Sequence, residues 1–390
     1  MNLYLQHGYG KGQKLSTLAS SGSLRGVILS PADEEYGSLE RTVLDARSRG
    51  LRVYIDPQAY VYSTTPRGLG RKHESHDIQF DDLHWSQGVD AIIDQIARVG
   101  AMHEKLNPDG VRIAPTVLQA SFDDVWTPTA FQLARTASSE WGRDKTVATL
   151  AIDEGALDTW RQVDTWLDVA TTLDVRGFYV LVGRSDAGYP PAPWSSERLA
   201  NLLRLIYVLS ELNGYEVCWG YSDGEGLAGL AAGASALAAG WNYSLRQFKP
   251  SKWQPVERKG GAQPNVRFYA QRLWSPLLAA VEADSLYSSE LRDRVFTAQD
   301  QEYIRSQPLT EMGVVDAQLQ YLRSLSQQAS LVASAGGVSE KLDYVESSLL
   351  EAEGSFASIE RLGIPLTRRY SSRVAAILES IRTFRAAESL

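Results

Sequence analysis

The chain has 390 residues, of which 44% are hydrophobic and 22% are charged, and these proportions exclude a disordered or fibrous protein. A formal net charge of -8 argues against binding to nucleic acid or to an anionic membrane through bulk charge, although a local basic groove stays open. The length allows one large domain and a smaller one.

Cysteine content and hydropathy exclude further classes of protein. The single cysteine, Cys218, excludes an intramolecular disulfide and a multi-cysteine zinc site. No stretch reaches the roughly 20 apolar residues of a membrane helix. We therefore expect a cytoplasmic protein that makes no membrane contact, and the sequence predicts no cofactor and no metal site.

Strand-like apolar runs alternate with helical patterns over the first 280 or so residues, as expected for βα units. The predicted strands are 3–7, 26–30, 51–56, 111–119, 147–153, 177–183, 215–221 and 234–241. The predicted helices include 38–49, 86–99 (closed by Gly100), 127–141, 157–172 and 198–212. Eight such units predict an α/β protein with a (β/α)8 TIM-type barrel over residues 1–282. A doubly wound sheet is the alternative.

The pattern changes after residue 282. Apolar residues recur at helical spacing around Leu322, Leu349 and Ile377, and no strand signal remains. We predict a C-terminal α-helical extension over residues 283–390. Its amphipathic helices would pack on the barrel, on a protein partner or on a second copy of the chain.

Polar side chains follow almost every predicted strand. The clearest case is the run 146–152, which leads directly into Asp153 and Glu154. In a barrel the carboxyl ends of parallel strands meet at one mouth, where active sites form. The predicted catalytic residues are the acids Asp56, Asp153, Glu154 and Asp223. The predicted substrate-binding residues are His7, Asp33, Gln58, Tyr60, Gln119, Arg184, Tyr221, Trp241 and Arg246.

Two features of the predicted mouth can be explained either by a role in the fold or by a role in function. Asp33 and Asp223 also fit positions that cap a following helix. The glycines at 8, 10 and 12, beside Lys11 and Lys14, either form a plain turn or leave backbone N–H groups free to hold a phosphate.

Two segments resemble a known family. Ile55-Asp56-Pro57-Gln58-Ala59-Tyr60 and Leu150-Ala151-Ile152-Asp153-Glu154 are similar to two motifs of tRNA-guanine transglycosylase-like barrels, in the same order. The resemblance implies a pocket in which Asp56 and Asp153 hydrogen-bond a purine-like base, on a barrel that acts on RNA or DNA. The chain departs from the family because it lacks the zinc-binding cysteines and has Ala238-Ala239-Gly240-Trp241-Asn242-Tyr243 where the late nucleophilic Asp should be.

Three functions follow as hypotheses. The first is a transglycosylase-like enzyme that binds or processes a nucleobase, nucleotide or nucleic acid and transfers or hydrolyses an N-glycosidic bond. The second is a catalytically silent barrel that serves as a binding subunit of a larger complex, for example in nucleic-acid processing or defence. The third is a carbohydrate-active hydrolase that uses two carboxyl groups.

Overall fold

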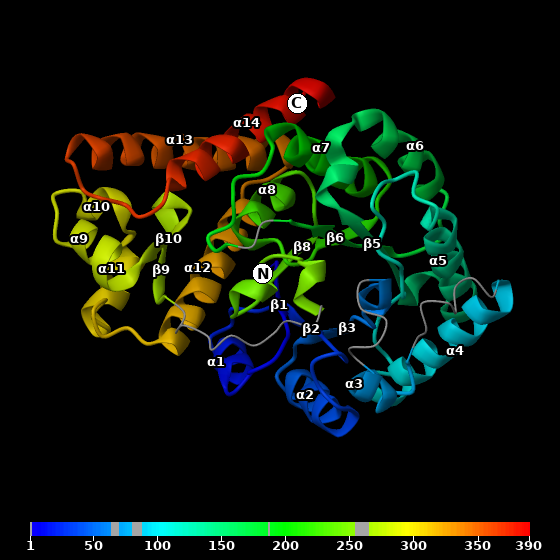
Figure 1. Cartoon of the computed structure of the whole chain (residues 1–390). Helices are drawn as coiled ribbons and strands as arrows, with labels where there is room; N and C mark the ends of the chain where they lie inside the picture. The colour runs from blue at the N-terminus through cyan, green and yellow to red at the C-terminus, as the bar shows by residue number, and fades with distance from the viewer. Residues whose placement is uncertain (1, 64–69, 80–87, 186–187, 254–264) are drawn as a thin grey trace.

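Eight parallel strands form the centre of the molecule, in the order β3-β2-β1-β8-β7-β6-β5-β4 (Figure 1). The structure, a computed structural model, describes residues 2–63, 70–79, 88–185, 188–253 and 265–390. The strands are β1 (Leu3–Gln6), β2 (Gly26–Leu29), β3 (Arg52–Ile55), β4 (Arg112–Ile113), β5 (Thr146–Asp153), β6 (Gly177–Gly183), β7 (Glu216–Trp219) and β8 (Ala236–Ala239). Within the described residues β3 and β4 touch without a ladder between them. The sheet is thus a nearly closed (β/α)8 barrel, and this prediction is confirmed.

The fourth strand is much shorter than predicted. It was expected over 111–119, but only Arg112 and Ile113 pair regularly with β5. Pro115 has no N–H to give to a ladder, so the regular pairing stops before it. The chain then returns to β5 at Gln119, which bridges Ile152.

Helices cover the outside of the barrel. They are α1 (Lys14–Ser20), α2 (Tyr36–Ser48), α3 (Gly70–Glu74), α4 (Val89–Leu106), α5 (Thr127–Trp141), α6 (Trp160–Ala170), α7 (Ser196–Tyr207) and α8 (Gly226–Ala231). The predicted end of α4 at Gly100 is wrong, because the helix continues for six more residues. A Cβ at Gly100 would lie 2.7 Å from the indole nitrogen of Trp141. This glycine therefore lets α5 approach α4.

The interior of the barrel is filled by side chains from alternate strand positions. Tyr4 stacks on Tyr54 at the amino-terminal end, with ring centroids 5.1 Å apart. Two residues along β1, the amide oxygen of Gln6 accepts a hydrogen bond from the hydroxyl of Tyr179 at 3.0 Å. The filling therefore becomes more polar toward the mouth.

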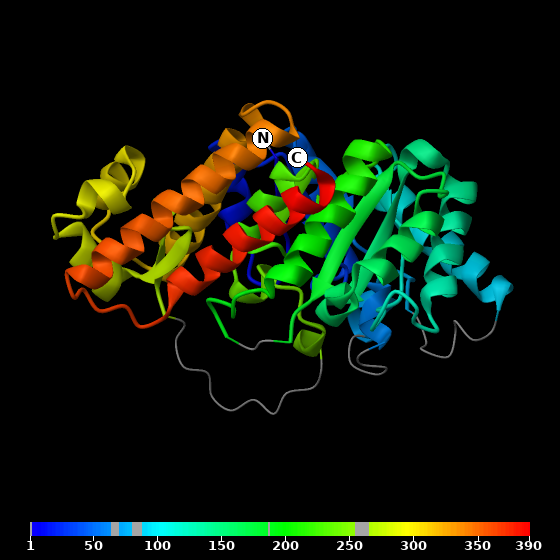
Figure 2. The same cartoon turned by 90° about the horizontal axis from the view of Figure 1, so that it is seen from above.

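A hairpin and a helical region follow the barrel (Figure 2). The hairpin is β9 (Arg267–Ala270) with β10 (Ser275–Leu278), which is not among the predicted strands. The helices are α9 (Asp284–Tyr287), α10 (Arg292–Val295), α11 (Ala298–Ser306), α12 (Val314–Ser334), α13 (Val338–Arg361) and α14 (Tyr370–Glu388). The predicted C-terminal helices are confirmed, and α12 to α14 pack on barrel helices α1, α7 and α8. No helix in the described ranges has both the length and the apolar character needed to cross a membrane.

A buried ion-pair network joins the last helix to the barrel. The guanidinium of Arg373 on α14 is 2.9 Å from Asp223 and donates a 2.7 Å hydrogen bond to Glu225. All three side chains are almost fully buried. Each carboxylate would be very costly to bury alone, so α14 supplies the charge that the loop after β7 needs.

We expect Arg373→Met to lower the free energy of unfolding by about 3 to 5 kcal/mol, because it leaves two buried carboxylates without their cation. Urea denaturation measures this change. The control is Arg382→Met on the same helix, where an exposed arginine pairs with Glu346 at 3.0 Å and the expected loss is below about 1 kcal/mol. Equal losses in the two variants would contradict a role for Arg373 in holding α14 to the barrel.

Candidate functional site

Asp56, directly after β3, is a buried carboxyl at the mouth of the barrel, with 1% of its surface exposed. One oxygen accepts a hydrogen bond from the backbone N–H of Gln58 at 2.9 Å, and the other accepts one from the hydroxyl of Tyr60 at 2.7 Å. Within the described part of the chain it has no cationic partner. Burial raises the pKa of Asp56 to about 7, and the two hydrogen bonds offset only part of that effect.

The backbone turn after β3 creates this arrangement. Gln58 adopts a left-handed conformation, with φ of 55°, and a 3-10 turn over Ala59–Ser63 follows. The amide oxygen of Gln58 accepts hydrogen bonds from the hydroxyl of Ser30 at 2.5 Å and from the N–H of Ala32 at 3.2 Å. The turn that carries Asp56 is thereby fixed to the end of β2.

Among the described residues, several buried polar groups around Asp56 lack a close hydrogen bond. The amide nitrogen of Gln6 has none within these ranges, and the amide nitrogen of Gln58 and the hydroxyl of Tyr221 make no close hydrogen bond although they lie near each other. All three side chains have 4% or less of their surface exposed. An unpaired buried donor is costly and usually marks a site for water or a ligand. The mouth of the barrel therefore offers hydrogen-bond donors that the described contacts do not fully use.

Aromatic rings form the wall beside these donors. Phe248 lies edge-on to Tyr60, with centroids 5.2 Å apart, and lies 5.6 Å from Tyr221. Its carbonyl accepts a hydrogen bond from the N–H of Arg184 at 2.9 Å, which brings the segment after β8 across the end of β6. A planar polar ligand would find both hydrogen bonds and ring surface here.

A second group of ionisable side chains lies at the ends of β1 and β2. His7 is fully buried, and the Nε2 atom is 3.6 Å from Glu34. Burial lowers the pKa of His7 to about 4, although Glu34 acts in the opposite direction, so the ring is neutral at pH 7. Lys11 pairs with Glu34 at 2.8 Å, and Lys252 lies 3.9 Å from Asp33.

Asp153 and Glu154 differ in their surroundings although they are adjacent. Asp153 is exposed and accepts a hydrogen bond from the N–H of Gly155 at 3.0 Å, so it caps the turn that follows. Glu154 is buried and lies 2.9 Å from the guanidinium of Arg184. It also accepts hydrogen bonds from the N–H and the hydroxyl of Ser185. Glu154 therefore holds the β5 and β6 ends together.

Asp223 and Arg246 lie in the contact between the barrel and the C-terminal helices. Asp223 accepts a 2.6 Å hydrogen bond from Tyr321 on α12 and pairs with Arg373. Arg246 lies over the ring of Tyr321, 3.4 Å from its centroid, and donates to the hydroxyl of Tyr189 at 2.9 Å. The structure thus gives both residues protein partners, and it does not place them in the group around Asp56.

Gln119 and Trp241 also have partners in the protein. Gln119 is buried, and its amide oxygen accepts a hydrogen bond from Thr127 at 2.8 Å. The indole of Trp241 donates to the carbonyl of Tyr9 at 3.1 Å, and its ring meets His7 edge-on. Trp241 therefore positions the chain after β1.

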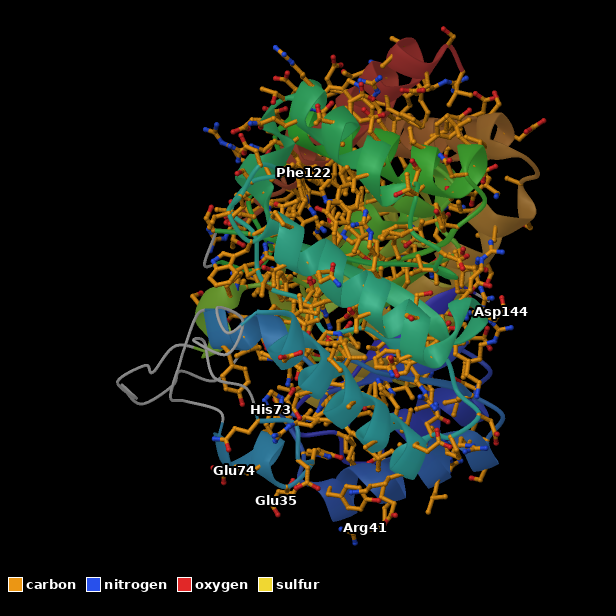
Figure 3. All side chains as sticks on the ribbon, turned by 90° about the vertical axis from the view of Figure 1, so that its right-hand side faces the viewer. Glu35, Arg41, His73, Glu74, Phe122 and Asp144 are labelled. Carbon is orange, nitrogen blue, oxygen red and sulfur yellow. The ribbon has the colours of Figure 1, made fainter. Side chains whose placement is uncertain are left out.

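Gln6, Glu34, Tyr179 and Phe248 were not among the predicted site residues. Gln6 and Tyr179 interrupt apolar strands with polar atoms, and this signal could have marked them as facing the interior near the mouth. Phe248 gave no signal, because it reaches the site from an irregular segment. In the side view of Figure 3, Glu35, His73 and Glu74 lie toward the mouth, and Asp144, which precedes β5, lies at the opposite end.

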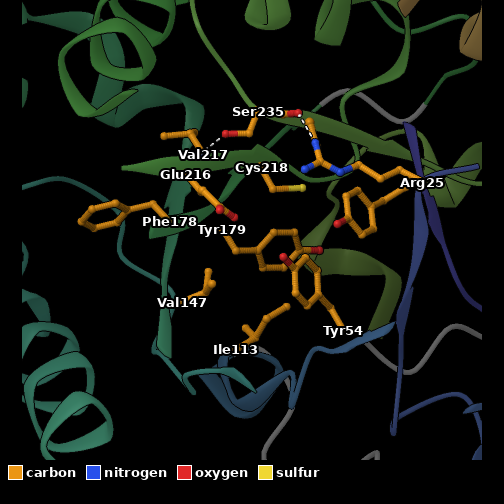
Figure 4. Close-up of a pocket in the computed structure, with 12 residues that line it drawn as sticks. Arg25, Tyr54, Ile113, Val147, Phe178, Tyr179, Glu216, Val217, Cys218 and Ser235 are labelled. Carbon is orange, nitrogen blue, oxygen red and sulfur yellow. Dashed lines mark hydrogen bonds between the residues drawn. The ribbon is translucent and has the colours of Figure 1, made fainter. Parts of the chain in front are cut away.

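A small cavity lies at that opposite, amino-terminal end of the barrel (Figure 4). It has a volume of about 20 Å³ and touches all eight strands or the residues just before them, which leaves room for little more than water. Cys218 faces it, and burial raises the pKa of this thiol to about 12. The thiol stays protonated at neutral pH and is not an activated nucleophile.

The fold and the mouth define a TIM-type (β/α)8 barrel protein with a buried polar site and a helical C-terminal region. No protein-family model matches the chain, and no curated protein matches it. Among solved structures, a probable tagatose 6 phosphate kinase from Sinorhizobium meliloti 1021 aligns over 99% of both chains, with 13% identity and a TM-score of 0.39. A similarity at this level supports no statement about function. In the described residues no three His, Cys, Asp or Glu side chains form a group that could hold a metal ion.

The raised pKa of Asp56 predicts a specific pH dependence of stability. The folded protein binds this proton more tightly than the unfolded chain, whose Asp titrates near 3.9. The contribution of this proton to the free energy of unfolding is complete below about pH 4. It is lost as the pH rises to about 7, by at most about 1.4 kcal/mol per pH unit. Urea denaturation from pH 4 to 8 should therefore show that Asp56→Asn gains stability relative to the unmodified protein as the pH rises. Asp144→Asn, at an exposed aspartate, is the control. Parallel pH curves for Asp56→Asn and the unmodified protein would contradict a raised pKa.

Proposed function

We propose that the mouth of the barrel is the active site of an enzyme that acts on the glycosidic bond of a nucleobase-containing ligand, with Asp56 as the proton-transferring group. The observation that carries this proposal is the buried carboxyl of Asp56, which has no cationic partner among the described residues and a pKa of about 7. A group that titrates near the working pH both donates and accepts protons efficiently. Perturbed carboxyls in a polar mouth are typical of catalytic sites.

The groups around Asp56 suit a heterocyclic base. A base edge alternates hydrogen-bond donors and acceptors, and the protonated carboxyl can offer one of each. The amides of Gln6 and Gln58 and the hydroxyl of Tyr221 add further contacts. Phe248 and Tyr60 provide ring surface on which a base can pack. The resemblance to tRNA-guanine transglycosylase-like barrels independently implicates Asp56 in base recognition.

In this proposal Asp56 protonates a ring nitrogen of the base as the bond to the sugar breaks, so the base leaves as a neutral molecule. A water molecule adds to the anomeric carbon of the sugar and gives its proton to the carboxylate of Asp153. Asp153 stays the proposed second carboxylate, since it is exposed at the end of β5 and the N–H of Gly155 is its one hydrogen-bond donor among the described residues. Glu154 and Asp223 then act by positioning, because Arg184 and Arg373 neutralise them.

A non-catalytic barrel is the second candidate. Two observations favour it. Glu154 and Asp223, which were predicted to be catalytic, form ion pairs with arginines. The sequence also lacks an Asp at the late position where the resemblance requires a nucleophile. In that case the mouth would bind its ligand without turnover, and the exposed surfaces of the C-terminal helices would contact a protein partner or a second copy.

Ligand released by heat from the purified protein and analysed by mass spectrometry tests the proposal first, with a nucleobase, nucleoside or nucleotide as the expected result. Guanine, adenine and their nucleosides are then titrated by calorimetry. We expect Asp56→Ala to weaken binding of the preferred compound about tenfold, since it removes both hydrogen bonds that the carboxyl makes to the base. Asp144→Ala should bind as the unmodified protein does.

Turnover separates the two candidates. Release of free base from the preferred nucleoside, lost in Asp56→Asn and strongly reduced in Asp153→Asn, supports the enzyme. Tight binding with no release of base supports the silent barrel. Binding that does not depend on Asp56 would refute both uses of this site.

A further inference from the structure

The loop after β1, residues 8–12, has empty space beside its glycines and is anchored by hydrogen bonds to the end of β8. Gly10 and Gly12 have φ values of 80° and 48°, and a Cβ at either position would meet nothing within 4 Å. The carbonyl of Tyr9 accepts hydrogen bonds from the side chains of Trp241 and Asn242, which fixes the loop to the end of β8. In the described chain, the backbone N–H groups of residues 8–13 donate no hydrogen bond. Successive free N–H groups in such a turn are suited to an anion.

Lysines from separate parts of the chain surround this loop. Lys14 donates to the carbonyl of Gly10 at 2.7 Å and lies 5.5 Å from the centre of the Trp241 ring. Lys72 on α3 donates to the backbone carbonyl of Asp33 at 2.7 Å and lies 5.6 Å from the Tyr9 ring.

Lys11 and Lys252 complete the group and are the two that contact carboxylates, those of Glu34 and Asp33. Two further ammonium groups, those of Lys14 and Lys72, donate only to backbone carbonyls among the hydrogen bonds of the described residues, so their charge is not neutralised by a carboxylate at hydrogen-bond distance.

An independent observation points to a ligand at the base of the loop. His7 directly precedes Gly8 and has none of its surface exposed, yet neither ring nitrogen has a hydrogen-bond partner in the described chain. One oxygen of Asp33 is buried and likewise without a hydrogen bond. A neutral imidazole offers one donor and one acceptor. The N–H of Ala32, beside Asp33, donates to Gln58, which links this segment to the turn that carries Asp56.

We propose that the ligand of the barrel carries a phosphate, bound by the N–H groups of residues 8–12 together with Lys14 and Lys72, while its base reaches Asp56. This inference rests on the proposed function for the base and specifies a nucleotide instead of a free base or nucleoside. Several ammonium groups and backbone donors match a compact dianion with many acceptor oxygens. His7 then faces the sugar or the ester oxygen between the two parts.

Calorimetric titration with inorganic phosphate, at fixed pH and ionic strength with chloride as the balancing anion, tests the phosphate site alone. We expect Lys14→Gln and Lys72→Gln each to weaken phosphate binding about tenfold, because each removes one charged donor. The control is Lys145→Gln, an exposed lysine at the amino-terminal end of the barrel, which should not change binding. Phosphate binding that is absent, or unchanged in both lysine variants, would overturn the inference.

The second arm compares guanosine 5′-monophosphate with guanosine, and the adenine pair in the same way. We expect the nucleotide to bind at least tenfold more tightly, and Lys14→Gln to remove most of this advantage without changing binding of the nucleoside. If nucleosides bind through Asp56 and the phosphate adds nothing, the phosphate site is refuted and the proposed function stands. If phosphate binds through the lysines but no base contact depends on Asp56, the proposed function fails and the anion site stands.

Discussion

The carboxyl of Asp56 is buried at the end of β3 with no cation beside it in the described part of the chain, and the properties of the barrel mouth depend on this constraint. A charge in that position is costly, so the group holds its proton up to about neutral pH. Its neighbours Gln58 and Tyr60 stabilise the ionised form only in part, and the amide nitrogen of Gln6 nearby has no acceptor within the described ranges. A ligand that supplies hydrogen-bond acceptors would offset both the cost of burying the Asp56 carboxyl and the cost of burying donors without partners. The physical chemistry of one strand end thereby points to a site for a polar molecule.

Asp223 shows the opposite solution to the same problem. It also follows a strand of the barrel and is buried, but Arg373 and Tyr321 from the helical region neutralise and hold it. The C-terminal helices therefore supply the positive charge that the buried acids after β7 need. On that side of the barrel α8 is only a short helix of six residues. The side of the mouth at β7 is thus fixed by ion pairs to the extension, whereas at the end of β3 the described contacts of Asp56 are hydrogen bonds alone.

Much of the fold could be predicted, because each buried parallel strand is an apolar run in the sequence. The first polar residue after such a run marks the carboxyl end of the strand. The barrel, the helical extension and the neighbours Asp56, Gln58 and Tyr60 follow from that pattern alone. The partners of the acids could not be predicted, since Arg373 lies 150 residues from Asp223 in sequence. Phe248 and the fragmentary β4 depend on irregular backbone, for which periodicity carries no information. Which strand-end acid is neutralised is decided by tertiary contacts.

The pKa of Asp56, measured directly, tests the central claim most simply. Carbon-13 NMR of the aspartate carboxyl groups, followed from pH 3 to 9 and assigned with Asp56→Asn, reports the titration of this one side chain in the folded protein. We expect a midpoint near pH 7, far above the 3.9 of an ordinary aspartate. A midpoint at or below 4 would show a solvated or ion-paired carboxylate, and the proposed chemistry of the mouth would lose its basis.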